Sequence, residues 1–92
     1  MKRSNNLWVI GEPRGWIVRH EGGFTPLVVC RTEREALTGA LELAANSNAS
    51  IVWQNVEGKI ADVWSQSGNN VLVNGAKISP KGKLKKFAYY KI

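Results

Sequence analysis

Short apolar runs, rich in β-branched and aromatic residues, alternate with turn-forming residues along the first third of the chain. Residues 7–10 and 16–20 form two such runs, and the residues between them include a proline and two glycines, which favour a turn. A third run, residues 26–30, follows a Gly-Gly pair and begins with Pro26, a residue type confined to strand starts and sheet edges. The pattern therefore predicts three antiparallel strands.

Side chains along a strand point alternately to the two faces of a sheet, so the pairing of the first two strands predicts which residues share a face. If Ile10 pairs with Trp16, then Trp8 pairs with Val18. This register places all four of these side chains on one side of the sheet.

The clearest local signal is the capping box Thr32-Glu33-Arg34-Glu35, in which the Thr32 hydroxyl accepts from the Glu35 amide and the Glu35 side chain reaches back. It predicts a helix from about residue 33 to about residue 46. Most apolar side chains of this segment fall in one broad arc, so we expect the helix to pack that face on the sheet. The arc consists of Ala36, Leu37, Ala40, Leu41, Leu43 and Ala44.

Two further hairpin patterns follow the helix. Residues 50–56 and 59–64 flank a Glu-Gly turn, and their pairing places Trp53 opposite Asp62. After the polar turn segment 65–70, an Asn-Gly pair lies between alternating residues of 71–78, which is the strongest hairpin signal in the chain. Residues 83–92 follow another turn and alternate as a final strand would.

These elements predict an α+β fold, an antiparallel sheet with one helix packed on one face, in the order ββ(β)αββ plus a C-terminal hairpin and strand. Residues 1–65 form a neutral body and residues 66–92 a basic extension, which we expect to belong to the same single domain. A chain of 92 residues can bury one small core without disulfides or metals.

Charge is distributed unevenly between these two parts. Residues 1–62 contain seven basic and seven acidic residues, whereas residues 63–92 contain six lysines and no carboxylate side chain. The whole net charge of +6 at pH 7 therefore comes from the last third. A cationic end on a neutral body favours a polyanionic partner over a catalytic role.

The basic end also carries aromatic residues in alternation with its lysines. If it is a strand, one face presents Lys83, Lys85, Phe87, Tyr89 and Lys91. Ammonium groups for phosphates and rings for base stacking are the combination that single-strand binders use. The predicted nucleic-acid-binding residues are Lys77, Lys81, Lys83, Lys85, Lys86, Phe87, Tyr89 and Lys91.

Two other interpretations of this end stay open. It can be an edge strand whose lysines block edge pairing while Phe87 and Tyr89 lie in the core. A helix lying on a membrane is disfavoured because the pattern lacks a continuous apolar stripe. No arginine follows Arg34, so any nucleic-acid contact by this end should be largely independent of base sequence.

The four tryptophans present a similar choice. Trp8, Trp16, Trp53 and Trp64 lie in predicted strands, and we expect them to be core or half-buried residues rather than an exposed stacking platform.

Candidates for catalysis are few. His20 and Cys30 are the only possible base and nucleophile pair, but Cys30 should lie across from Trp16, four residues or about 13 Å from His20. One histidine and one cysteine cannot build a zinc site, and the carboxylates lie in separate turns and strands. We therefore predict no catalytic residue, no metal site and no cofactor.

The apolar run at 7–10 is too short for a signal peptide or a membrane span, and a single cysteine fits a reducing compartment. A cytoplasmic protein with no membrane partner is the expectation.

A family resemblance covers about residues 8–64. Its matching positions are Trp16 and Val18 in a Trp-x-Val strand, Thr32, Glu35 and Ala36 at the helix start, Ala40 and Ala44 along the helix, and Gly58 and Ile60 in a Gly-x-Ile turn. At these positions the chain resembles the small bacterial proteins grouped as domain of unknown function 2188. The resemblance implies a ββαββ-like fold but names no activity, because the family is uncharacterised, and the basic extension departs from the family pattern.

The function predicted from these observations is that of a small non-enzymatic binding module that contacts nucleic acid through its lysine and aromatic end. The alternative is a protein interaction or regulatory module, such as a phage or mobile-element accessory protein, that binds an acidic protein partner. Exposed sheet edges would also permit a homodimer.

Overall fold

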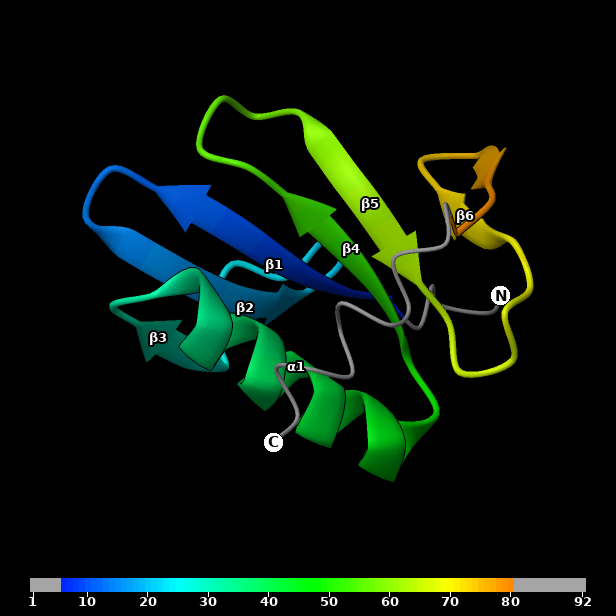
Figure 1. Ribbon diagram of the computed structural model, residues 1–92, viewed down its shortest axis with the longest axis horizontal. Helices are drawn as coiled ribbons and strands as arrows, with labels where there is room; N and C mark the ends of the chain where they lie inside the picture. The colour runs from blue at the N-terminus through cyan, green and yellow to red at the C-terminus, as the bar shows by residue number, and fades with distance from the viewer. Residues whose placement is uncertain (1–5, 81–92) are drawn as a thin grey trace.

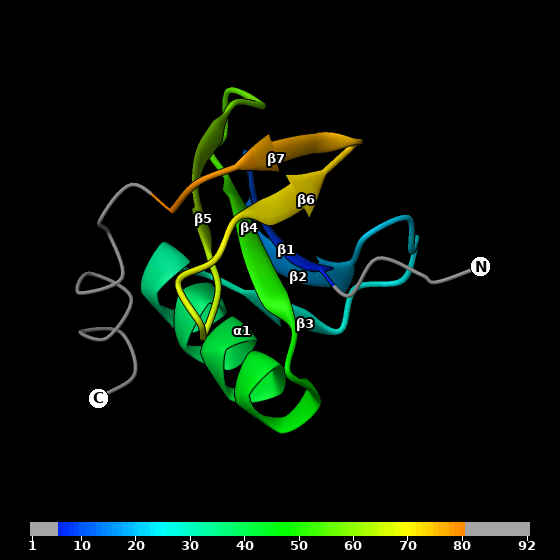
Figure 2. The ribbon, with the colours of Figure 1, turned by 90° about the vertical axis from the view of Figure 1, so that its right-hand side faces the viewer.

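A five-stranded sheet is the centre of the fold, with a helix on one face and a two-stranded sheet on the other (Figure 1, Figure 2). This computed structural model describes residues 6–80. Its elements are β1 (Asn6–Glu12), β2 (Gly15–His20), β3 (Val28–Cys30), α1 (Glu33–Ser47), β4 (Ser50–Gln54), β5 (Ile60–Trp64), β6 (Val71–Val73) and β7 (Ala76–Ile78). The predicted α+β class is confirmed.

The large sheet has the strand order β3-β2-β1-β4-β5 and is mixed rather than wholly antiparallel. All its pairs are antiparallel except β1 and β4, which run parallel with Leu7 beside Ile51 and Val9 beside Trp53. The reason is the position of α1 in the chain. A helix between two strands returns the chain to the end of the sheet where it began, so β4 runs in the same direction as β3 and therefore as β1.

The first hairpin forms with a register one residue away from the predicted one. Trp16 pairs with Gly11 and Val18 pairs with Val9, because β1 continues to Glu12 and only two residues make the turn. The shift moves Trp16 and Val18 to the helix-facing side, while Trp8 stays on the opposite face. The prediction that Trp8, Ile10, Trp16 and Val18 share one face is therefore wrong.

The helix follows its prediction closely. The Thr32 hydroxyl accepts from the Glu35 amide at 3.2 Å and donates to the Glu35 carboxylate at 2.9 Å, so the start of α1 is capped. Asn48, in the left-handed conformation, caps the other end. The buried arc consists of Ala36, Leu37, Ala40, Leu41 and Ala44, with Leu43 only partly buried.

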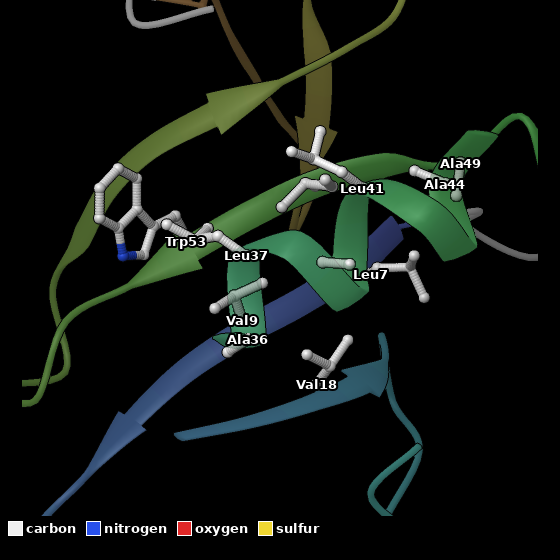
Figure 3. Packing of buried hydrophobic residues seen from close by; sticks show 11 residues of the cluster. Leu7, Val9, Val18, Ala36, Leu37, Leu41, Ala44, Ala49 and Trp53 are labelled. Atoms are coloured by element: carbon white, nitrogen blue, oxygen red, sulfur yellow. The ribbon is translucent and has the colours of Figure 1, made fainter. Parts of the chain in front are cut away.

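The first core lies between α1 and the large sheet. Leu7, Val9 and Val18 from β1 and β2 meet Leu37 and Leu41 of the helix (Figure 3). Leu7 and Leu37 are almost completely buried, and burying such side chains contributes about 1.5–3 kcal/mol each. This core supports the helix-facing side of every strand from β1 to β4.

The second hairpin pairs as predicted, with Trp53 opposite Asp62. Its strands are shorter than expected because a bulge follows Trp53 and the side chain of Asn55 organises the turn, accepting from the amides of Glu57 and Lys59 at 3.0 Å each.

The C-terminal hairpin turns at Asn74 and Gly75, whose φ angles of 49° and 85° are those of the predicted primed turn. It packs Val71 and Val73 against Val52 and Val63 on the second face of the large sheet, which makes a second small core (Figure 2). The predicted final strand at 83–92 lies outside the described residues.

The tryptophans belong to these cores, as predicted. Trp53 is buried, and Trp8, Trp16 and Trp64 are partly buried against one core or the other.

Candidate nucleic-acid interface

One of the eight predicted nucleic-acid-binding residues, Lys77, lies in the described part of the chain. It is exposed on β7. The other seven, Lys81, Lys83, Lys85, Lys86, Phe87, Tyr89 and Lys91, lie outside the described residues.

The turn chemistry of the C-terminal hairpin determines where Lys77 points. Because Asn74 and Gly75 make a two-residue turn, Val73 pairs with Ala76 and Leu72 pairs with Lys77. Val71 and Val73 face the large sheet, so the alternation of a strand directs Leu72 and Lys77 outward. The exposed fraction of Leu72 is 55%, which shows that this outer face is open.

A shallow depression of about 510 Å³ lies beside Lys77. It is lined by Gly68, Asn69, Asn70, Leu72 and Lys77. Two serine hydroxyls hold its rim, since Ser65 donates to the Asn69 carbonyl and Ser79 donates to the Asn70 side-chain oxygen, both at 2.7 Å. One cationic and several neutral polar groups are thus gathered around an open surface.

A hydrogen-bond network attaches the hairpin to the body. The buried Asn6 side chain donates to the Leu72 carbonyl at 2.6 Å and to Glu21 Oε1 at 3.1 Å. The indole of Trp8 donates to the same Glu21 oxygen at 2.9 Å. One asparagine therefore connects β6 with the loop after β2.

The described residues carry little net charge of their own. Residues 6–80 contain seven acidic side chains and six basic ones, which are Arg14, Arg19, Arg31, Arg34, Lys59 and Lys77. Any strongly positive field must therefore come from residues outside this range, namely Lys2 and Arg3 at the start of the chain and the five lysines that follow residue 80.

The candidate nucleophile and base are apart, as predicted. Cys30 pairs with Trp16 at one end of the β2–β3 ladder, and His20 lies exposed at the other end of β2. Partial burial, together with the nearby Glu35 carboxylate, raises the pKa of the Cys30 thiol, which keeps it in its unreactive protonated form.

Metal ligands do not gather in the part of the chain that the structure describes. Within residues 6–80, no group of three or more histidine, cysteine or carboxylate side chains lies close enough to hold a metal ion.

Sequence reasoning missed the neighbours of Lys77. The pairing of Leu72 with Lys77 follows from the Asn-Gly turn and was accessible in advance. The sequence around Asn69 and Asn70 indicated only a turn. Their position beside Lys77 depends on the path of the loop after β5, which no local pattern predicts.

Fold and surface together define the class of protein: a small α+β domain with a capped helix on a mixed sheet and a basic C-terminal extension. A family model described as "Uncharacterized protein conserved in bacteria (DUF2188)" matches residues 8–66, from β1 to just beyond β5. The chain belongs to this family, which confirms the resemblance seen in its sequence. The β6–β7 hairpin and the lysines lie outside the match.

Searches of curated proteins and of solved structures found no match to the chain. Among the described residues, no helix has the length and apolar character needed to cross a membrane.

Proposed function

We propose that this chain is a non-enzymatic, cytoplasmic nucleic-acid-binding module whose lysine-rich end contacts the phosphate backbone. The observation that carries the proposal is the separation of charge along the chain, with six lysines and no carboxylate side chain after residue 62. Phosphates attract such a segment, and the release of their counterions provides much of the binding free energy.

The outer face of the β6–β7 hairpin supports this role as the start of the contact surface. Lys77 is exposed there beside the depression lined by Asn69 and Asn70. Amide side chains add neutral hydrogen bonds to phosphate oxygens and sugars, which position a strand without reading its sequence. Lysine without arginine in this segment again favours contacts that do not depend on base sequence.

The second candidate function is contact with an acidic protein. The edge strand β3 favours it, because Leu27 and Val29 are 44% and 73% exposed at that edge. Exposed apolar side chains at the outermost strand of the sheet, as residues 6–80 form it, suit a protein partner.

A titration of labelled oligonucleotides with the full chain separates the two candidates. The test variant replaces the five lysines beyond residue 80, namely Lys81, Lys83, Lys85, Lys86 and Lys91, with glutamine, and the control is Lys59→Gln in the body. We expect wild type and control to bind at low salt and the five-lysine variant to bind at least 10-fold more weakly. If wild type shows no binding to single-stranded or duplex oligonucleotides at low salt, nucleic-acid binding is ruled out and contact with an acidic protein becomes the favoured function.

A further inference from the structure

We propose that a second cleft, between β1–β2 and the turn of the β6–β7 hairpin, binds an unpaired nucleobase and makes single-stranded nucleic acid the preferred partner. This inference rests on the proposed function and names its substrate class. The cleft is lined by Trp8, Arg19, Glu21, Gly22 and Asn74, and its volume is about 240 Å³. Sites for drug-sized ligands occupy roughly 300–1,000 Å³, so this cleft suits one planar group.

Trp8 and Arg19 provide the chemistry for a base. They are directly paired on β1 and β2, so their side chains leave the same face of the sheet as neighbours. Trp8 packs against the second core but is only partly buried and also lines the cleft, so the open part of its indole ring is a surface on which a base can stack. The guanidinium group and the Asn74 amide supply donors and an acceptor for the edge of the base.

The charges of the cleft favour a base over a phosphate. Arg19 and Glu21 carry opposite charges on the same small surface, so the cleft has no net positive charge to attract an anion. A neutral heterocycle with both donors and acceptors can use both groups. The phosphates would instead lie with the lysines of the chain's end.

Hydrogen bonds within the protein hold the ring of Trp8 in place. Its indole N–H donates to Glu21 Oε1 at 2.9 Å, and Asn6 donates to the same oxygen and to the Leu72 carbonyl. These bonds connect both walls of the cleft, since Glu21 lies in the loop directly after β2 and Leu72 lies in the hairpin. A preformed surface loses little conformational entropy on binding.

Phe24 offers a second ring at the same end of the molecule. Its side chain is 94% exposed, and it lies two residues, or at most about 7 Å of chain, beyond Gly22 of the cleft. Figure 2 shows the loop after β2 and the turn of the hairpin at the same end of the fold. A base next to the one in the cleft can stack on this ring, whereas bases paired within a duplex cannot enter.

The test compares oligonucleotides that differ only in their bases. Fluorescence anisotropy would measure binding of the full chain to an oligothymidylate of about 12 nucleotides, to an oligouridylate and an abasic strand of the same length, and to a duplex. The variants are Arg19→Gln and Phe24→Ala. Their controls are Arg34→Gln on α1 and Val56→Ala in the β4–β5 turn, two exposed positions away from the cleft, whereas Arg19 itself is half-buried.

Wild type should bind the thymidylate strand at least about 5-fold more tightly than the abasic strand, the low end of base-stacking contributions. Arg19→Gln and Phe24→Ala should each lose most of this preference while binding the abasic strand as wild type does, and the controls should keep it. Oligouridylate should bind with an affinity similar to that of the thymidylate strand, because the cleft contacts the base and not the sugar.

Equal binding of thymidylate and abasic strands would overturn the cleft and leave the lysine-rich end as the contact. A preference for bases that both variants retain would also overturn it, because the bases would then bind elsewhere. Absence of binding to every strand would overturn the cleft and the proposed function together.

Discussion

Gly11 shows how one missing side chain determines the pairing of two strands. A Cβ atom at this position would lie 2.8 Å from the ring of Trp16 and 2.8 Å from a methyl group of Val56. Trp16 can therefore lie across β1 only because residue 11 is glycine. This contact belongs to the register in which Trp16 pairs with Gly11 and faces the helix side of the sheet.

Replacing Gly11 with alanine should lower the free energy of unfolding by about 1–3 kcal/mol, because two packed side chains would have to move. The matched variant is Gly39→Ala in α1, where the nearest atom would lie 3.8 Å from the new Cβ. Alanine should stabilise that helix by up to about 1 kcal/mol. Urea unfolding of both variants checks this pair, and an unchanged midpoint for Gly11→Ala would contradict the packing described.

At the scale of elements, the β6–β7 hairpin covers the second face of the large sheet and completes the second core. Val71 and Val73 are each 2% exposed. They cover Val52 of β4 and Val63 of β5, two apolar side chains on the sheet face opposite the helix. Asn6 fastens the hairpin through the Leu72 carbonyl. The hairpin therefore stabilises the body and presents Lys77 on its outer side.

Val73→Ala should cost about 1.5–3 kcal/mol of stability, since it removes buried methyl groups from the second core. Leu72→Ala, its outward neighbour, should change stability by no more than about 0.5 kcal/mol. Denaturant unfolding followed by tryptophan fluorescence measures both. Equal effects of the two substitutions would mean that the hairpin is not packed as the structure has it.

Local sequence signals predicted the helix and the hairpins, whereas the pairing of distant strands depends on non-local contacts. Thr32 with Glu35, and Asn74 with Gly75, each specify a conformation within four residues, so α1 and the last hairpin were predicted correctly. The parallel pairing of β1 with β4 joins segments more than 40 residues apart, and no local pattern records it. The outward direction of Lys77 also follows from the local Asn-Gly turn, whereas a cleft that joins Trp8 to Asn74 brings together segments far apart in the chain and has no local signal.

At the scale of the whole molecule, an electrically balanced domain carries a cationic end. Residues 6–80 hold seven acidic and six basic side chains, while five lysines follow them without a single carboxylate side chain. The body contributes shape, two cores and an open hairpin face, and the end contributes charge. This division of roles predicts that salt should affect binding mainly through the lysines of the end.

The most direct test is the dependence of affinity on salt for a single-stranded oligonucleotide. The logarithm of the association constant should fall linearly with the logarithm of salt concentration, by about 0.7 for each phosphate neutralised. Replacing Lys81, Lys83, Lys85, Lys86 and Lys91 with glutamine should make the slope shallower by up to about 3.5, while Lys59→Gln should leave it unchanged. An identical slope for wild type and the five-lysine variant would contradict the account.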